Sequence, residues 1–297
     1  GGTVRGVTTD RDDGEIRARV VVACDGVNSF LAKEAGLYPG FSASHITLGV
    51  KEVLGFPRRV IEERFGLKDD EGADYEIVGC TDGIPGGGFI YTNLESVAIG
   101  LVLSLEQYAA KGRRPEDLLA DFKRHPAIEP LVKGGELLEY SAHMIPEGGY
   151  AHMPELVTDG MVVAGDAAAM CLAAGIWLEG VNFAIGAGLA AGEAVAEAIS
   201  AGDTSKEGLA GYRTRLDESF VLADHKRLRG APGLVLSDRV QNRYPEVVCN
   251  LFERMFTVTN PVPKEGAVRI ARTELKRSGI RWRDALKDGW KVWRVFG

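Results

Sequence analysis

The hydrophobic positions of this chain follow two different patterns in turn, one typical of βα units and one typical of an antiparallel sheet. At the beginning, Val4 to Thr9 and Glu15 to Cys24 are rich in β-branched residues and flank an Asp-Gly turn, which predicts an antiparallel hairpin. The second segment ends in the apolar run Val20 to Ala23, turns at Asp25-Gly26 and leads into a helix from Ser29 to Ala35. A buried strand followed by a glycine turn and a helix is a βα unit.

From about Phe41 to Pro154 the pattern changes to short strands with alternating apolar and polar positions. The predicted strands are His45 to Leu54, Tyr75 to Cys80, Gly88 to Asn93, Ser96 to Ser104 and Leu137 to His143. One helix, Pro115 to Arg124, interrupts them, with proline at its first position and acidic residues in its first turn. We expect an antiparallel sheet with a covering helix.

After residue 154 the first pattern returns. Gly160 to Asp166 predicts a second buried strand with a glycine turn, and a long Ala/Gly-rich helix follows from about Val181 to Ser200. Tyr212 to Gly297 predicts helices separated by prolines. The sequence therefore predicts a discontinuous α/β domain at residues 1–40 and 155–211, an inserted antiparallel-sheet domain at 41–154, and a helical C-terminal region at 212–297.

Composition and charge narrow the function classes. The chain has 297 residues, 45% of them apolar, with 35 Lys+Arg against 42 Asp+Glu, which argues against a basic nucleic-acid binder. No uninterrupted apolar run approaches the roughly 20 residues that cross a bilayer, so we expect a membrane to be touched and not spanned. Four scattered cysteines without C-x-x-C indicate no zinc site and no locally ligated iron–sulfur cluster. Four unpaired thiols fit a reducing compartment, and two long-range disulfides are the alternative. Because the sequence shows no secretory signal peptide, we expect the protein in the cytoplasm.

Two acid–glycine pairs, Asp25-Gly26 and Gly165-Asp166, each close an apolar strand. In open α/β sheets ligands bind beyond the carboxyl ends of the strands. Glycine lets the backbone approach a ligand closely, and aspartate accepts hydrogen bonds from sugar or ribityl hydroxyls. Each pair alone is also a common turn or helix cap. Together they predict a site for one polyhydroxylated cofactor.

The stretch from Gly175 to Asn182 places two glycines just before the long helix. The unpaired N–H groups and the dipole at a helix start favour an anion, such as the negative charge of a reduced flavin. The alternative is a glycine-rich loop packed under a helix. Residues 186–191 match G-x-G-x-x-A inside the helix, so they predict close packing instead. Gly86-Gly87-Gly88 lacks the Gly-Lys-Ser/Thr of a phosphate loop and leads into a strand.

These motifs, in this order, resemble FAD-dependent oxidoreductases of the glutathione-reductase-like fold. More narrowly, four stretches are similar to the FixC branch of the electron-transfer-flavoprotein:quinone oxidoreductase family: Val50 to Val53, Gly86 to Asn93, Phe122 to Ile128 and Glu139 to Gly149. The resemblance extends over nearly the whole chain. The family's first strand and Gly-x-Gly-x-x-Gly loop have no counterpart here, so we expect an N-terminally truncated Rossmann-type domain that lacks its first βαβ unit.

The resemblance implies FAD as the cofactor, with three groups of residues around it. They are Asp25, Gly26, Asn28 and Ser29 near the isoalloxazine or ribityl, Gly165, Asp166 and Ala167 on the ribityl and pyrophosphate side, and Gly180, Val181 and Asn182 beside the pyrimidine ring. The strand that lies by the quinone in larger relatives corresponds to Gly87, Gly88, Phe89 and Tyr91. No metal ligand and no catalytic acid or base is predicted, because flavin electron transfer demands none and the five histidines suit structural or exposed positions.

The implied function is electron transfer from a reduced electron-transfer flavoprotein to a quinone. Larger family members carry a C-terminal [4Fe-4S] domain, which this chain lacks, so the resemblance implies a separate small ferredoxin-like partner. An isoprenoid (geranylgeranyl) reductase or an aromatic-ring monooxygenase shares the acid–glycine pairs and is the alternative within enzymes. A cofactor-free interaction subunit is the alternative from another class.

The C-terminus is basic and rich in tryptophan. Lys264 to Gly297 carries ten Lys/Arg against four Asp/Glu. Apolar residues recur at helical spacing, and basic residues follow one position later: Trp282, Leu286, Trp290 and Trp293, then Arg283, Lys287, Lys291 and Arg294. Such a helix suits an anionic membrane surface, with packing on the core or docking of the iron–sulfur partner as alternatives. We expect a cytoplasmic protein, peripheral on the inner face of the cytoplasmic membrane.

Overall fold

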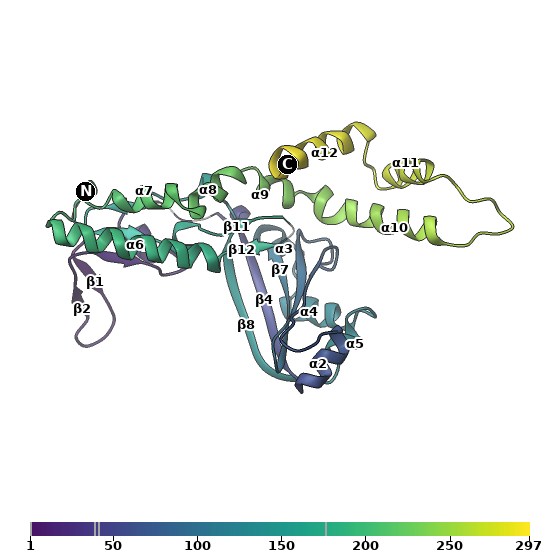
Figure 1. The fold of residues 1–297 in the computed structure, drawn as a ribbon, viewed down its shortest axis with the longest axis horizontal. Coiled ribbons are helices and arrows are strands. Elements are labelled where there is room, and N and C mark those ends of the chain that lie inside the picture. The colour runs from purple at the N-terminus through teal and green to yellow at the C-terminus, as the bar shows by residue number, and fades with distance from the viewer. Residues whose placement is uncertain (1, 39, 41, 176) are drawn as a thin grey trace. The chain divides into compact units, whose positions relative to one another are not determined.

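The computed structural model describes residues 2–38, 40, 42–175 and 177–297. The chain forms two compact units, each discontinuous in sequence (Figure 1). Unit 1 contains residues 1–46 and 145–232, and unit 2 contains residues 47–144 and 233–297. Ile176 of the predicted Gly175 to Asn182 stretch, and Phe41 at the predicted start of the sheet domain, lie outside the described residues.

Unit 1 is built around a small sheet of strand order β3-β10-β9. Its strands are β3 (Val21–Ala23), β10 (Met161–Val163) and β9 (Val157–Thr158). Strand β10 runs parallel to β3, with Met161 opposite Val21 and Val163 opposite Ala23, and antiparallel to β9. The two predicted strands are therefore neighbours in one sheet, but only β10 is buried throughout, because Val22 of β3 is exposed and Ala23 is its one fully buried residue.

The predicted N-terminal hairpin is confirmed. The prediction that its second strand continues from Glu15 to Cys24 is wrong. Strands β1 (Gly6–Thr8) and β2 (Glu15–Arg17) form the hairpin (Figure 1). The segment Glu15 to Cys24 then divides, because β2 pairs with β1 while β3 pairs with β10 in a different sheet.

The helices of unit 1 pack around this sheet. Its remaining elements are α1 (Phe30–Glu34), η1 (Ala43–His45), η2 (Tyr150–His152), η3 (Gly165–Ala168), β11 (Leu172–Ala173), β12 (Leu178–Glu179), α6 (Val181–Ala201), α7 (Gly211–Glu218) and α8 (Phe220–Arg227). Helices α6 and α7 run side by side (Figure 1). The Tyr212 hydroxyl of α7 donates a hydrogen bond to the Val163 carbonyl at 2.9 Å, which fixes α7 to the end of β10.

Helix α6 is the predicted Ala/Gly-rich helix, and its length and mean hydropathy of 1.3 would suffice to cross a membrane. The expectation that no uninterrupted apolar run is long enough still holds, because Asn182, Glu193 and Glu197 interrupt the apolar residues of this helix. The face that includes Phe183, Ala187 and Ala191 is buried in the core of unit 1. This packing accounts for Ala187, Ala190 and Ala191 of the stretch 186–191, whereas Gly188 and Leu189 are exposed and do not take part in it.

Unit 2 contains an antiparallel sheet of strand order β5-β6-β7-β4-β8. Its strands are β4 (Ile46–Gly55), β5 (Asp74–Ile77), β6 (Gly86–Thr92), β7 (Ser96–Ser104) and β8 (Glu136–Pro146). Side chains alternate between its two faces. One face carries Val50, Ile90, Ile99 and Leu101, which form a core with Phe122 and other residues of the covering helices. The opposite face, termed the Phe89 face, carries Glu76, Gly87, Phe89, Tyr91 and Gly100.

The expectation of a single helix in this region is wrong. Helix α4 (Pro115–Arg124) has the predicted bounds, and α2 (Arg58–Phe65), α3 (Leu105–Lys111) and α5 (Glu129–Val132) accompany it. Helix α2 is eight residues long and buries only Ile61 and Phe65. Its other positions are mostly charged, with the i,i+4 pairs Arg58–Glu62 and Arg59–Glu63, so its apolar pattern is too short to reveal a helix.

The region predicted as helical at 212–297 does form helices, but α7 and α8 belong to unit 1. The rest of the region is a helical part of unit 2. Its elements are α9 (Ala231–Val235), the π-helix η4 (Arg239–Arg243), α10 (Tyr244–Phe256), α11 (Ala267–Arg277) and α12 (Trp282–Phe296). Side chains of η4 bind the turn that precedes β6. Gln241 Oε1 accepts from the Gly86 amide at 3.4 Å, and the Asn242 side chain donates to the Gly83 carbonyl at 3.2 Å.

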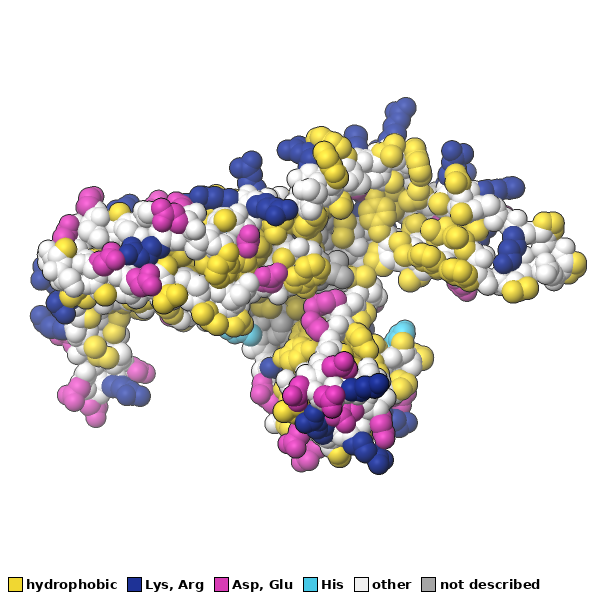
Figure 2. All heavy atoms as spheres, viewed as in Figure 1, with side chains coloured by type: hydrophobic (Ala, Val, Ile, Leu, Met, Phe, Trp, Pro, Cys, Tyr) yellow, Lys and Arg dark blue, Asp and Glu magenta, His cyan; other side chains and the backbone are white. Residues whose placement is uncertain are grey.

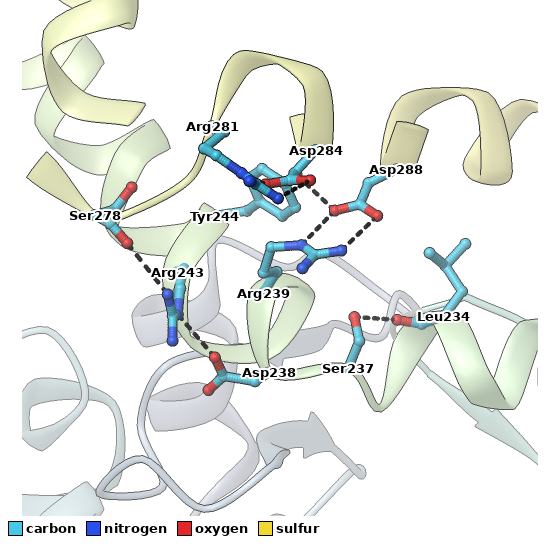
Figure 3. A network of polar contacts seen from close by, with 10 residues as sticks. All are labelled: Leu234, Ser237, Asp238, Arg239, Arg243, Tyr244, Ser278, Arg281, Asp284 and Asp288. Carbon is cyan, nitrogen blue, oxygen red and sulfur yellow. Dashed lines mark hydrogen bonds and ion pairs between the residues drawn. The ribbon is translucent and has the colours of Figure 1, made fainter. Parts of the chain in front are cut away.

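A buried carboxylate ties α12 to η4 and α10 (Figure 3). Asp288 is 6% exposed and accepts from Arg239 Nε at 2.6 Å and Arg239 Nη2 at 2.9 Å. The Tyr244 hydroxyl donates to the same carboxylate at 2.8 Å. The hydrogen bonds from Arg239 lower the pKa of Asp288, while burial and Asp288 raise the pKa of Tyr244 to about 12.

Replacing Asp288 with asparagine should destabilise unit 2. The pKa of Asp288 is lower in the folded than in the unfolded chain, so its contribution is present above the unfolded value of about 3.9 and is lost as pH falls through the folded value. Asp288→Asn should lower the free energy of unfolding by about 1–3 kcal/mol near neutral pH and remove this part of the acid dependence. Urea unfolding followed by the tryptophan fluorescence of α12 measures both.

Glu63→Gln in α2 of the same unit is the matched control, because Glu63 forms an exposed i,i+4 pair with Arg59. Solvent-exposed ion pairs contribute little to the free energy of unfolding, so this variant should have almost the same free energy of unfolding as the wild type. Equal losses in the two variants would contradict a special role for the buried network.

Candidate functional site

Parallel pairing of β3 with β10 brings the two acid–glycine pairs to one edge of the sheet of unit 1. The Ala164 amide donates to the Ala23 carbonyl at 3.0 Å, which extends the pairing just beyond both strands. Asp25-Gly26 and Gly165-Asp166 follow directly. The convergence that the sequence predicted over some 140 residues is therefore present in the fold.

Ser29 ties the two turns together. Its hydroxyl lies 3.1 Å from the Ala167 carbonyl, and the Tyr38 hydroxyl donates to it at 2.7 Å. Ser29 is fully buried and has a left-handed backbone, with φ of +50°. Ser29, predicted as a cofactor contact, therefore holds the Asp25 turn against η3. The Tyr38 hydroxyl supports the Ser29 side chain, and the sequence analysis did not identify Tyr38.

Asp25 has one buried oxygen that no group of the described chain satisfies. Its Oδ2 accepts from the Leu31 amide at 2.9 Å near the start of α1, whereas its Oδ1 is buried without a hydrogen-bond partner. Such an acceptor is costly unless a donor reaches it. Next to it, Gly26 has φ of +74° and open space where a side chain would begin. A hydroxyl-bearing ligand fits both features.

The Gly165-Asp166 turn lies against the start of α6. A Cβ on Gly165 would stand 3.5 Å from the Ala184 Cβ, and one on Gly180 would stand 3.9 Å from Asp166 Oδ1. The Asp166 carboxylate is therefore beside the residue that precedes α6. Val181 and Asn182 are exposed in the first turn of this 21-residue helix.

The start of α6 supplies hydrogen-bond donors to this edge. The first intrahelical bond is donated by the Ala184 amide to the Gly180 carbonyl. The preceding amides are the donors that a helix leaves without an intrahelical acceptor, and they carry the positive end of its dipole. The side chain of Asn182 donates to Glu179 at 2.8 Å. Of the predicted cofactor residues, Asn28 is exposed in the Asp25 turn.

The sequence patterns did not identify two buried side chains near this edge as site residues. Glu147 is 3% exposed, and its amide donates to the His45 carbonyl at 2.8 Å. Cys171 is buried, and this burial together with the charges of Glu147 and Asp166 raises its pKa well above the usual value. Cys171 is therefore a protonated thiol and no nucleophile. A single glutamate beside two glycines is the sequence signal for Glu147, and it is a weak one.

His225 on α8 is the fully buried histidine of unit 1. Its Nδ1 donates to the Val221 carbonyl at 2.6 Å, and its ring meets Phe183 edge-on at 4.5 Å between centroids. Burial lowers the pKa of His225, so the ring is neutral near pH 7. It has the structural position expected from the sequence.

In unit 2 the predicted quinone residues divide between the two faces of the sheet. The rings of Phe89 and Tyr91 stack at 5.9 Å with 15° between their planes. Gly87 shares their face. Gly88 points to the opposite side, where a Cβ would come within 2.8 Å of both Cys80 Sγ and Phe122 Cζ. Gly88 therefore belongs to the helix-covered core, and the candidate ligand surface keeps Gly87, Phe89 and Tyr91.

Comparison with protein families matches both parts of unit 2. Residues 47–145 match the family model "ETF-QO, ubiquinone-binding", and residues 231–297 match the "ETF-QO/FixC family C-terminal domain". Protein FixC of Salmonella typhimurium is 41% identical over 98% of this chain and 67% of its own length. The probable electron transfer flavoprotein-quinone oxidoreductase YdiS of Escherichia coli is 39% identical with the same coverage. The chain thus spans about two thirds of these relatives.

Among solved structures, a geranylgeranyl bacteriochlorophyll reductase-like protein of Thermoplasma acidophilum is similar at a TM-score of 0.62 and 18% identity. The match covers 93% of this chain and 66% of that one. The flavin-dependent brominase Bmp2 is similar at a TM-score of 0.52 and 16% identity, over 89% of this chain and 64% of that one. The predicted fold, an FAD-binding α/β domain with a sheet insert and a helical C-terminal region, is confirmed.

Removal of the Ser29 hydroxyl tests the tie between the two turns. Ser29→Ala should leave buried groups of Ala167 and Tyr38 with fewer partners, and so lower the free energy of unfolding by about 1–3 kcal/mol. Thermal or urea unfolding followed by circular dichroism measures this loss. Ser200→Ala in the last turn of α6 removes an exposed hydroxyl and should have little effect. A loss no larger than this control's would mean that the tie is not needed.

Proposed function

This chain belongs to the electron-transfer-flavoprotein:quinone oxidoreductase/FixC family, and we propose that it binds FAD on unit 1 and a quinone on the Phe89 face of unit 2. The activity is that of an FAD-dependent oxidoreductase, which passes electrons from a reduced electron-transfer flavoprotein to the quinone. The observation that carries the proposal is the convergence of Asp25 and Asp166 at one sheet edge, with a buried acceptor, Asp25 Oδ1, awaiting a donor.

The residues of unit 1 suit the parts of FAD. When bound, FAD supplies a carrier that takes up two electrons and can release them singly. The carboxylates of Asp25 and Asp166 would accept hydrogen bonds from ribityl hydroxyls, and Gly26 and Gly165 let the backbone approach. The amides of Val181 and Asn182, at the positive end of the α6 dipole, would favour negative charge on the pyrimidine ring. Asn28, Ala167 and Gly180 border the same edge, and the buried Ser29 positions it.

The Phe89 face suits a flat aromatic ring. Phe89 and Tyr91 form a stacked pair, the Phe89 ring lies over the buried Gly100, and the partly exposed Gly87 lies on the same face. A quinone ring would stack on this pair in an offset or edge-on manner. The ubiquinone-binding family model matched at residues 47–145 supports this ligand.

The alternative enzymes share the fold and differ in their electron donor. An isoprenoid reductase or an aromatic-ring monooxygenase would carry the same FAD site, and a monooxygenase would take its electrons directly from a nicotinamide cofactor. Rapid mixing of the flavin-loaded protein with NADH, and separately with reduced electron-transfer flavoprotein, distinguishes these reactions. We expect flavin reduction by the protein donor. Direct reduction by NADH would contradict the proposal, and a correctly folded protein that takes up no flavin would favour the cofactor-free subunit.

The FAD site is tested by its two carboxylates. Asp166→Ala and Asp25→Ala should each weaken FAD binding by about tenfold or more, because each removes hydrogen bonds from a charged acceptor. The visible flavin absorbance per protein, measured after dialysis, reports occupancy. Asp12→Ala in the exposed β1–β2 turn is the matched control. Wild-type occupancy in both site variants would refute the assignment.

We also propose a peripheral contact of α12 with an anionic membrane surface on the cytoplasmic side. Trp282, Trp290 and Trp293 are 54%, 57% and 68% exposed. Basic side chains accompany them, and the Arg294 guanidinium lies 4.8 Å from the centre of the Trp290 ring. Apolar and basic side chains lie side by side over α10 and α12 (Figure 2). This combination suits the lipid interface in which a quinone is dissolved.

Two further features bear on partners and location. All four cysteines, each within the described residues, are free thiols, which suits a reducing cytoplasm. The resemblance to the FixC branch supports a separate small ferredoxin-like [4Fe-4S] protein as a partner beside the electron-transfer flavoprotein. Docking of that protein is the competing use of the basic helix.

The membrane contact predicts a lipid-dependent change in sedimentation. The double variant Trp290→Ser/Trp293→Ser should bind phosphatidylglycerol vesicles at least about tenfold more weakly than the wild type, since two large apolar groups no longer insert. Phosphatidylcholine vesicles should bind both proteins poorly. Leu94→Ser in the turn between β6 and β7, an exposed apolar position, is the control. Equal sedimentation of the double variant and the wild type would exclude α12 as the contact.

A further inference from the structure

A quinone site needs a source of protons as well as electrons. A quinone becomes a quinol by gaining two electrons and two protons, and the protons must reach its ring oxygens. Sequence reasoning assigned no acid or base to this chain. The strand register of unit 2 places one carboxyl group at the proposed quinone surface, and a role for this group rests on the quinone-binding function proposed for unit 2.

Glu76 lies on the Phe89 face, directly across from Phe89. In the antiparallel ladder of β5 and β6, Glu76 is paired with Phe89, and Asp74 with Tyr91. Paired side chains stand on the same face about 5 Å apart. The neighbouring Tyr75 confirms the alternation, because its ring stacks on Phe65 of α2 at 5.7 Å on the helix-covered face. Glu76 therefore points to the side of the stacked aromatic rings.

Its surroundings favour the protonated form. Partial burial, together with the Asp74 carboxylate two residues away, raises the pKa of Glu76 to about 6. Asp74 is the charged group that acts on Glu76, and the facing residues of β6 are the aromatic Phe89 and Tyr91. A carboxyl group with this pKa is mostly protonated below about pH 6 and partly protonated above it, so it can both hold and release a proton.

Glu76 can also recover its proton. Strand β5 is at the edge of the sheet, where β6 is its one partner among the described residues, and Glu76 is exposed to solvent. A proton given to a ligand on the Phe89 face can therefore be replaced from water without any movement of the protein.

We propose that Glu76 is the proton donor to a quinone bound on the Phe89 face. The Glu76 O–H bond breaks and an O–H bond forms at one ring oxygen as the ring gains the two electrons that reduced electron-transfer flavoprotein supplies in the proposed function. The second ring oxygen takes its proton from water, and the Glu76 carboxylate is reprotonated from solvent. Before reduction, the protonated carboxyl donates a hydrogen bond to the quinone carbonyl and so contributes to binding.

Quinone binding tests this role without turnover. Binding of a short-chain ubiquinone, followed by quenching of protein fluorescence, should be about fivefold tighter below the pKa of Glu76 than above it, as expected for one hydrogen bond. Glu76→Gln keeps a donor at this position, so it should bind the quinone with no such pH dependence. Asp74→Asn should move the midpoint to lower pH, because it removes the negative charge that raises the pKa of Glu76. Glu95→Gln, in the exposed turn between β6 and β7, should behave as the wild type.

Turnover separates binding from proton transfer. In flavin-loaded Glu76→Gln, quinol formation should fall by about a hundredfold, since an amide donates a hydrogen bond but no proton. Reduction of the flavin by electron-transfer flavoprotein should keep its wild-type rate.

The outcomes distinguish this role from the function on which it rests. A Glu76→Gln protein that binds quinone with wild-type pH dependence and reduces it at the wild-type rate would overturn the role of Glu76 alone. A wild-type protein that binds no quinone at any pH would overturn the proposed function, and this role with it. Carbon-13 NMR of the Glu76 carboxyl gives a direct titration, for which we expect a midpoint of about 6.

Discussion

Parallel pairing of β3 with β10 is the contact on which unit 1 depends. Three residue pairs, extended by the bond from the Ala164 amide to the Ala23 carbonyl, hold together segments that are about 140 residues apart in the chain. The two turns that carry Asp25 and Asp166 then lie at one edge, and Ser29 closes the contact between them. Because η3 also packs under α6, the same pairing fixes where the helix dipole lies relative to both carboxylates.

Unit 2 depends in the same way on its strand register. A period of two residues gives one face to the core under α2 and α4 and leaves Glu76, Phe89 and Tyr91 together on the other. A slip of one residue between β5 and β6 would move Glu76 to the helix-covered side. The register is supported from outside the sheet, since Gln241 of η4 binds the first amide of β6.

Periodicity in the sequence was sufficient for elements with long and regular patterns. Strand β7 and helix α4 have the predicted bounds, because a continuous apolar run in the strand and an N-terminal proline in the helix leave little ambiguity. Helix α2 was missed because charged residues occupy most of its positions. The division of the segment from Glu15 to Cys24, the inward direction of Gly88 and the position of Glu76 beside Phe89 all depend on pairing between distant strands, which local patterns do not contain.

The ring of Phe89 occupies the space that the missing side chain of Gly100 leaves on the adjacent strand, where a Cβ would stand 2.2 Å from its Cζ. The ring is thus confined from below by backbone and from the side by Tyr91. A side chain held in this way has already lost most of its rotamer freedom when the chain folds. A flat ligand that settles on it incurs a smaller entropic cost, so the sheet converts folding free energy into a preorganised surface.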